Sequence, residues 1–313
     1  CVPERPTIVA ESPRYPQGNL AACMLPWNES YELDEAVFTR HLQETLDGGY
    51  QNAYILGTAG EGYALSEERF RHVVTVFAKH MVRDGIDPQV GVIGLSMEQT
   101  LTRLQFAHEQ GIRMFQISLP SWGALDDREA LQFFQTVCGA FPDARFLHYN
   151  LPRAGRILHG EEYAAIAAAV PNLVATKNSS SDYARTADLM INAPMLQHFL
   201  LEGNFALGCT VGECSLLCSY DALFPRTTWQ FFEAGQRRDL PELFRIAEVF
   251  YRVGCQLFAH CPREMIDGSY DKTFLWLRDP SFSNRLLPPY IGLSDEESQT
   301  CREVFQTHFQ DIP

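Results

Sequence analysis

The sequence has no long hydrophobic run and no excess of positive charge. Its 313 residues include 39 acidic and 25 basic side chains, which gives a net charge of −14 when His is neutral. No apolar stretch approaches the roughly 20 residues needed to cross a bilayer. A nucleic acid or an anionic membrane needs a basic face on its partner. We therefore expect neither as a partner, whereas a small anionic substrate still fits a site that is locally positive.

The patterns of a metal site or a disulfide framework are also missing. Nine cysteines are scattered along the chain, and none forms a Cys-x-x-Cys pair. Cys209, Cys214 and Cys218 are close in sequence, but their spacing fits no metal-binding pattern, and no His comes closer than His198. We expect them to be small apolar side chains, with no bound metal. An odd cysteine count without a recognisable signal peptide predicts a reducing, cytoplasmic location.

Glycine-rich nucleotide motifs are absent as well. No Gly-x-Gly-x-x-Gly follows the first predicted strand, and no Gly-x-x-x-x-Gly-Lys-Ser/Thr occurs. A dinucleotide or nucleotide site therefore has no support, while a doubly wound open sheet stays an alternative fold.

What the sequence does contain is a regular alternation of short apolar runs and longer amphipathic segments. Strands are predicted at residues 20–25, 51–56, 89–95, 113–119, 145–149, 173–177, 195–201 and 213–219. Helices are predicted at residues 33–47, 66–83, 96–111, 126–140, 161–170, 181–192, 205–211 and 227–237. Strands separated by helices pair in parallel through right-handed crossovers. Eight such units predict an α/β fold, a (β/α)8 TIM barrel.

The barrel accounts for only part of the chain. Residues 1–18 are rich in Pro and charge and are expected to form an N-terminal arm over the surface. Residues 19–238 are assigned to the barrel. Residues 239–313 are predicted to form a C-terminal helical subdomain, with helices at 241–258, 270–278 and 294–309.

Lys177 is an unusual residue for the end of a predicted buried strand. It closes the apolar run at 173–176 and precedes a polar segment. An ammonium group is seldom buried without a partner, because desolvation disfavours its charged form and lowers its pKa. A neutral amine attacks a ketone and forms a Schiff base. The alternative is an ordinary loop lysine, and its position alone does not decide between the two.

Two further strand ends carry groups suited to the same chemistry. Active sites of (β/α)8 barrels lie at the carboxyl ends of the strands. Tyr149 there suits proton transfer, and Thr58 suits a hydroxyl relay to that phenol. The glycines around Thr58 allow backbone N–H groups to approach a substrate carboxylate. Two alternatives remain: Tyr149 could only line the wall of the site, and residues 57–62 could be a plain turn. Glu61 is expected to have a structural role, since a carboxylate suits the entry of a helix.

These motifs together resemble one known family. Three segments carry the likeness: residues 57–61 (Gly-Thr-Ala-Gly-Glu) followed by 65–68 (Leu-Ser-Glu-Glu), residues 149–152 (Tyr-Asn-Leu-Pro), and the lysine segment at 174–180. They resemble the signatures of the dihydrodipicolinate synthase/N-acetylneuraminate lyase family. Similarity extends from about residue 20 to residue 309, including 285–289 and 293–297.

The resemblance implies a class I, metal-independent aldolase or lyase that acts on a pyruvate-like 2-keto acid. Lys177 would be the Schiff-base lysine, Tyr149 the proton-relay tyrosine and Thr58 its hydroxyl partner. The backbone around Thr58 and Ala59 would bind the keto-acid carboxylate. No cofactor is expected beyond the covalent Schiff base. Family members are commonly tetramers built as dimers of dimers, which implies a homo-oligomer, either a dimer or a tetramer.

Several positions depart from the family pattern. Ala59 replaces a hydroxyl residue, and Trp122 stands where dihydrodipicolinate synthases send a tyrosine across a dimer interface. Their substrate arginine would fall at Ala154, which Arg153 and Arg156 flank. The usual Gly-Asp-Asp segment reads Gly-Asn-Phe, starting with Gly203 and Asn204, and the eighth-strand glycine-rich stretch is also altered. These changes argue against lysine biosynthesis, and the segment after Tyr149 argues against N-acetylneuraminate cleavage. Candidate substrate-binding residues are Ala59, Gly60, Trp122, Arg153, Gly203 and Asn204.

Three readings of the function stay open. An aldolase or lyase is favoured, and an aldehyde would be its second substrate. A 2-keto-3-deoxy acid dehydratase would use the same Schiff base and expel a hydroxyl group. A catalytically impaired homologue that only binds a keto acid is suggested by Ala59 and by the altered eighth-strand loop, although a pure binder needs no nucleophile.

Overall fold

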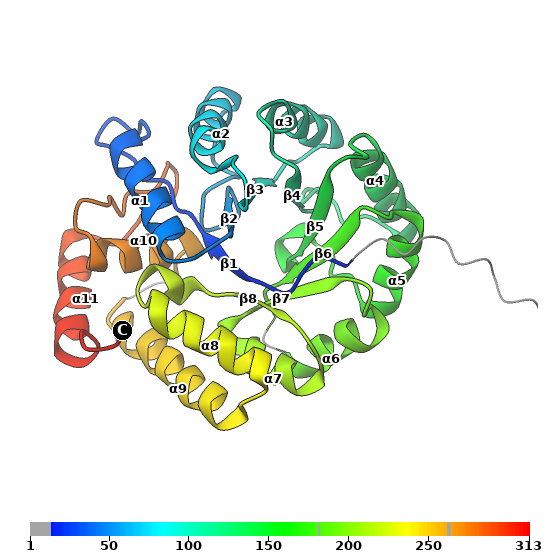
Figure 1. Cartoon of the computed structure of the whole chain (residues 1–313). Helices are drawn as coiled ribbons and strands as arrows, with labels where there is room; N and C mark the ends of the chain where they lie inside the picture. The colour runs from blue at the N-terminus through cyan, green and yellow to red at the C-terminus, as the bar shows by residue number, and fades with distance from the viewer. Residues whose placement is uncertain (1–13, 181, 262–263) are drawn as a thin grey trace, which may run out of the picture.

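Eight parallel strands pair in chain order and close into a barrel, with β1 hydrogen-bonded to β8 (Figure 1). The computed structural model describes residues 14–180, 182–261 and 264–313. The strands are β1 (Asn19–Ala22), β2 (Asn52–Ile55), β3 (Asp87–Val92), β4 (Met114–Ile117), β5 (Arg145–Asn150), β6 (Leu173–Asn178), β7 (Gln197–Leu201) and β8 (Ser215–Leu217). This architecture confirms the predicted (β/α)8 barrel.

A helix follows each strand and lies on the outside of the barrel (Figure 1). These helices are α1 (Glu35–Asp47), α2 (Glu67–Met81), α3 (Met97–Glu109), α4 (Asp127–Gly139), α5 (Gly160–Ala169), α6 (Tyr183–Asn192), α7 (Glu202–Val211) and α8 (Pro225–Arg237). Short 3₁₀ turns η1 (Pro152–Ala154) and η2 (Ser219–Ala222) follow β5 and β8. The predicted start of the sixth helix, at residue 181, lies outside the described residues.

Polar residues in the sequence set several of these helix starts. Ser66 accepts a hydrogen bond from the backbone N–H of Arg69, which caps α2. Ser96 likewise accepts from Gln99 N, but the Gln99 side chain accepts from Leu95 N and not from Ser96 N. Only one of the two reciprocal hydrogen bonds of a capping box is therefore formed at this helix. The strand β3 ends at Val92, three residues before its predicted end.

Three more helices follow the barrel: α9 (Leu240–Leu257), α10 (Asp267–Arg278) and α11 (Asp295–His308). One apolar cluster joins them to the strands, because it contains Phe199 and Leu216 of the barrel together with Ile246, Phe250 and Phe274. The C-terminal helices thus share a core with the barrel. None of the helices in the described part of the chain combines the length and apolar character needed to span a bilayer.

The described end of the predicted N-terminal arm does not lie on the surface. Tyr15 is only 3% exposed, and its hydroxyl donates to Asn52 at 3.1 Å and to Asp87 at the amino ends of β2 and β3. The ring lies against Phe199 of β7. Residues 14–18 therefore close the amino end of the barrel, because an aromatic ring fills space that the short strands leave. Residues 1–13 lie outside the described chain.

Candidate active site

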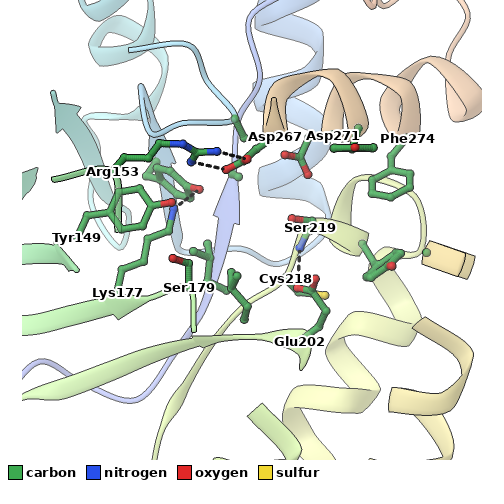
Figure 2. A pocket seen from close by; sticks show the side chains of 18 of the residues that line it. Tyr149, Arg153, Lys177, Ser179, Glu202, Cys218, Ser219, Asp267, Asp271 and Phe274 are labelled. Carbon is green, nitrogen blue, oxygen red and sulfur yellow. Dashed lines mark hydrogen bonds and ion pairs between the residues drawn. The ribbon is translucent and has the colours of Figure 1, made fainter. Parts of the chain in front are cut away.

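A cavity of about 750 Å³ opens at the carboxyl ends of the strands (Figure 2). Barrel residues form its floor, and α9 and α10 form the opposite wall. The lining residues are Ala22, Tyr54, Ala59, Tyr149, Pro152, Arg153, Lys177, Ser179, Leu201, Glu202, Leu217, Cys218, Ser219, Tyr220, Gly254, Phe258, Asp267, Tyr270, Asp271 and Phe274. The C-terminal helices thus complete a site whose reactive groups come from the strands.

Lys177 lies on β6 and points into this cavity (Figure 2). Its Nζ donates to the Tyr54 hydroxyl at 3.0 Å and lies 4.0 Å from the centre of the Tyr149 ring. The side chain is only 4% exposed. Burial lowers the pKa of Lys177 from 10.5 to about 8, although the charges of Asp267, Asp271 and Glu202 act in the opposite direction. A substantial fraction of this amine is therefore neutral near physiological pH.

Strand register places Tyr149 beside the lysine. In the parallel pair of β5 and β6, Tyr149 lies directly opposite Lys177, so both side chains face the barrel interior. The Thr58 hydroxyl donates to the Tyr149 hydroxyl at 3.4 Å, a long hydrogen bond. Burial raises the pKa of Tyr149 to about 12, and the bond from Thr58 opposes this shift. The three residues assigned to catalysis from the sequence are thus brought together, with the phenol protonated at neutral pH.

The turn that carries Thr58 and Ala59 follows β2. Ala59 lines the cavity, whereas Gly60 is buried behind it, where a Cβ would lie 2.7 Å from the backbone N of Leu56. At Gly57 a Cβ would lie 2.7 Å from Cε2 of Tyr54. The glycine at position 57 therefore leaves room for the ring that contacts the Lys177 amine.

Glu61 ends this turn and has the structural role expected of it. It is fully buried, and its carboxylate accepts hydrogen bonds from Trp27 Nε1 at 2.8 Å and from Leu287 N at 2.7 Å. It also forms an ion pair with Lys272 of α10, which is equally buried. The pair ties the turn at the end of β2 to the helix that forms the cavity wall.

Three carboxyl groups line the cavity: Asp267 and Asp271 on the α10 wall, and Glu202 at the start of α7 on the facing barrel side (Figure 2). Burial raises the pKa of Asp271 well above its usual range and also raises that of Glu202. Ser219 N donates to Glu202 at 3.3 Å. Asp267 forms an ion pair with Arg153 at 3.0 Å. Arg153 does line the cavity, as expected, but its charge is matched by this carboxylate.

Besides Gly60, three of the expected substrate-binding residues do not line the cavity: Trp122, Gly203 and Asn204. Trp122 is 90% exposed in the loop between β4 and α4. Gly203 and Asn204 lie in the first turn of α7, and the Asn204 amide is directed to Thr186 of α6. Because α7 already begins at Glu202, Gly203 and Asn204 belong to the helix and do not line the cavity. Glu202 is the residue of this first turn that lines it.

Tyr54 and the carboxyl groups of α10 are the functional residues that sequence reasoning missed. Alternation along β2 places Asn52 and Tyr54 on the same side of the strand, so a polar aromatic residue at an interior position was a signal. Asp267 and Asp271 are four residues apart and therefore share one face of α10. No short motif marks them, because they reach the site only through docking of α10.

The described residues contain no group of three or more His, Cys, Asp or Glu side chains placed to hold a metal ion. Cys209 and Cys214 have their sulfur atoms 3.8 Å apart in the core. His198 is buried, and its ring nitrogens contact the Thr176 hydroxyl at 2.7 Å and the backbone oxygen of Ala193 at 3.0 Å.

Comparison with known proteins identifies the class. The profile of the dihydrodipicolinate synthetase family matches residues 15–307, and the chain belongs to this family. A 4-hydroxy-tetrahydrodipicolinate synthase from Thermus thermophilus is 30% identical over 163 residues, which are 51% of this chain and 54% of the relative. The N-acetylneuraminate lyase of Rattus norvegicus is 26% identical over 240 residues, 72% of each chain. The match to the Thermus synthase thus spans about half of that protein's length.

Solved structures show the same fold at low identity. A prophage protein of the dihydrodipicolinic acid synthase family from E. coli K12, solved in complex with pyruvate, superposes with a TM-score of 0.84 at 15% identity, over 93% of this chain and 98% of that one. A Clostridium difficile protein in complex with mannosamine gives 0.82 at 14% identity, over 94% and 99%. At such identities the likeness establishes the fold and leaves the substrate open.

Proposed function

We propose that the protein is a Schiff-base lyase or aldolase that acts on a pyruvate-like 2-keto acid through Lys177. The observation that carries the proposal is the buried Lys177 amine, which has a pKa of about 8 and lies between two tyrosine rings at the floor of a large cavity. Membership of a family that includes named synthases and lyases supports it.

The first half of the reaction attaches the keto acid to the enzyme. The neutral Lys177 amine attacks the ketone carbon, and the resulting carbinolamine loses water to give a protonated imine. The Tyr149 phenol is the donor that protonates the departing hydroxyl, and Thr58 supports the phenol through the hydrogen bond at 3.4 Å. The turn at Thr58 and Ala59 holds the substrate carboxylate through backbone N–H groups.

The second half makes or breaks a carbon–carbon bond. The protonated imine withdraws electrons, so the adjacent carbon releases a proton and an enamine forms. The enamine carbon attacks the carbonyl carbon of an aldehyde, whose oxygen takes up a proton. Water then adds to the imine, which releases the product and regenerates the amine. Cleavage is the reverse sequence. The covalent bond to Lys177 supplies the electron sink, so the proposed mechanism needs no cofactor.

A borohydride trapping experiment tests the proposal directly. Lys79, Lys177 and Lys272 are the only three lysines of the chain, so the modified residue can be assigned by peptide mapping. Pyruvate with sodium borohydride is expected to give one adduct, located on Lys177. The adduct should be absent in Lys177→Arg, because guanidinium stays charged, and retained in Lys79→Arg, since Lys79 is exposed. An adduct that persists in Lys177→Arg would refute the assignment.

Product analysis separates the aldolase from the dehydratase that uses the same intermediate. Incubation of a 2-keto-3-deoxy acid should yield pyruvate and an aldehyde if a carbon–carbon bond breaks. Loss of one water from the intact carbon chain would instead identify a dehydratase.

We further propose that the protein works as a homo-oligomer, either a dimer or a tetramer. Leu95, in the loop after β3, is 62% exposed, and Trp122, in the loop after the neighbouring strand β4, is 90% exposed. A second copy of this chain would cover these side chains. The chain resembles synthases that send a tyrosine across a dimer interface from the position of Trp122. This resemblance supports a second copy of the chain as the partner that covers Trp122.

A further inference from the structure

The half of the cavity remote from Lys177 is built from aromatic rings. Tyr220, Phe258, Tyr270 and Phe274 line it. Their ring centres form a continuous series, with Tyr220 and Phe274 at 5.2 Å, Phe274 and Phe258 at 5.6 Å, and Phe258 and Tyr270 at 4.8 Å. Aromatic faces carry partial negative charge and attract cations, quaternary ammonium groups in particular.

Carboxyl groups accompany these rings. Asp267, Asp271 and Phe274 are spaced by four and three residues on α10 and therefore share one face. Figure 2 shows Asp271 between Asp267 and Phe274, across the cavity from Ser219 and Glu202. Carboxyl groups and aromatic rings thus meet in the same part of the cavity.

Two of the three carboxyl groups have no cationic partner. Asp271 is only 3% exposed. Neither Asp271 nor Glu202 forms an ion pair within the part of the chain that the structure describes, and Asp267 already neutralises Arg153. Lys177 must be uncharged to act as a nucleophile. Burial without a cationic partner raises the pKa of Asp271 and of Glu202 in the free protein. A bound cation would favour the ionised form of both groups, because an opposite charge nearby lowers the pKa of a carboxyl group.

We propose that the aldehyde acceptor carries a positive charge, an alkylammonium group, which binds between the aromatic rings and the Glu202 and Asp271 carboxyl groups. The inference rests on the proposed function, since the keto acid occupies the Lys177 end. An anionic acceptor is disfavoured here, because Arg153 of the cavity lining is already paired with Asp267 and the rest of this region presents carboxyl groups and rings. A neutral polyhydroxylated acceptor is the main competitor, because protonated carboxyl groups also bind hydroxyls.

A matched set of aldehydes tests this inference. Trimethylammonioacetaldehyde and 3,3-dimethylbutanal have nearly the same shape and differ by one positive charge, and 4-oxobutanoate supplies an anion. With pyruvate as donor, kcat/KM measured from aldol product is expected to be at least about tenfold higher for the cation than for its neutral isostere, as cation–π and carboxylate contacts imply. The anion should be the poorest of the three. An equal or lower value for the cation, or a preference for glyceraldehyde, would overturn the inference.

Substitutions at the wall provide the second arm. Asp271→Asn is expected to reduce the ratio of cation to neutral kcat/KM toward one, and Glu202→Gln serves the same purpose if the first variant does not fold. Asp84→Asn removes an exposed carboxylate outside the site and should leave the ratio unchanged. If pyruvate still forms the borohydride adduct but neither wall variant changes the ratio, the inference fails and the proposed function stands. If no adduct forms in the parent protein, the proposed function itself fails.

Discussion

At the scale of single residues, the reactivity of Lys177 is a balance between burial and nearby negative charge. Burial removes water from the ammonium group and favours the neutral amine, whereas Asp267, Asp271 and Glu202 favour the charged form. Burial is the larger effect, since the pKa of Lys177 falls to about 8. The same carboxyl groups suit the later steps, because the imine formed on the amine is positively charged.

The pH dependence of adduct formation follows from this balance. Below the pKa of about 8 the amine is protonated and cannot attack, so the rate of pyruvate adduct formation should rise with pH and level off above that value. Asp267→Asn removes the largest charge that raises the Lys177 pKa, and the midpoint should therefore move to lower pH. The rates can be measured by timed borohydride quenching and intact mass. A midpoint unchanged by Asp267→Asn, with Asp84→Asn as control, would contradict the balance described.

Tyr149 and Tyr54 both contact the amine but differ in their expected roles. Tyr149→Phe removes the proposed proton donor, and turnover should fall by roughly 10²–10⁴-fold, the usual range for a lost acid or base. Tyr54→Phe removes one hydrogen bond of 3.0 Å from Nζ. Loss of one such bond, worth about 1.5 kcal/mol, corresponds to a decrease of about tenfold in the rate of adduct formation. Single-turnover kinetics distinguish the two, and a Tyr149→Phe rate within twofold of the parent would remove Tyr149 from the mechanism.

At the scale of secondary-structure elements, the turn after β2 is held in a costly conformation. Leu56 and Glu61, which flank it, have φ angles of 66° and 55°, a left-handed region that non-glycine residues seldom adopt. The buried bonds of Glu61 to Trp27, Leu287 and Lys272 hold this conformation. At Gly268, a Cβ would lie 2.9 Å from the backbone oxygen of Ala59, so α10 packs directly on the turn.

The Glu61–Lys272 pair should therefore link stability and activity. Lys272→Met leaves a buried carboxylate unpaired and is expected to cost about 3–5 kcal/mol in the free energy of unfolding. In the double variant Glu61→Gln/Lys272→Met the loss should be smaller than the sum of the single losses. Each single variant leaves one buried charge unpaired, whereas the double variant leaves none. Urea unfolding measures the three values. Strict additivity would show that the pair is not coupled.

At the scale of the whole molecule, the site of one chain has a closed wall on the α9 and α10 side and an exposed Trp122 in the loop after β4. We expect light scattering after size exclusion to give a mass of two or four chains. Trp122→Glu should shift the distribution toward smaller species, because it places a charge in the proposed contact. Tyr251→Glu, on the 72% exposed Tyr251 of α9, is the matched control. A monomeric parent protein would refute the proposed assembly.

Much of the fold was predictable because its signals are local. Apolar runs of strand length and caps such as Ser66 depend on neighbours in sequence, and they predicted all eight strand–helix units. Boundaries were less reliable. α7 begins at Glu202, immediately after β7, and α10 begins at Asp267, three residues before its predicted start. Glu202 and Asp267 stand near the ends of predicted segments, where packing and not periodicity decides the helix start.

By itself, the sequence determined the barrel and the family, and it singled out Lys177, Tyr149 and Thr58 for the proposed chemistry. Motif and periodicity suffice for these, because each lies at the end of a predicted strand or in the turn directly after it. Only the tertiary structure decided that Tyr54 contacts the Lys177 amine from across the barrel and that α10 lines the cavity with carboxyl groups. Those contacts join segments far apart in sequence, and no local pattern encodes a distance that exists only after the barrel closes and the C-terminal helices dock.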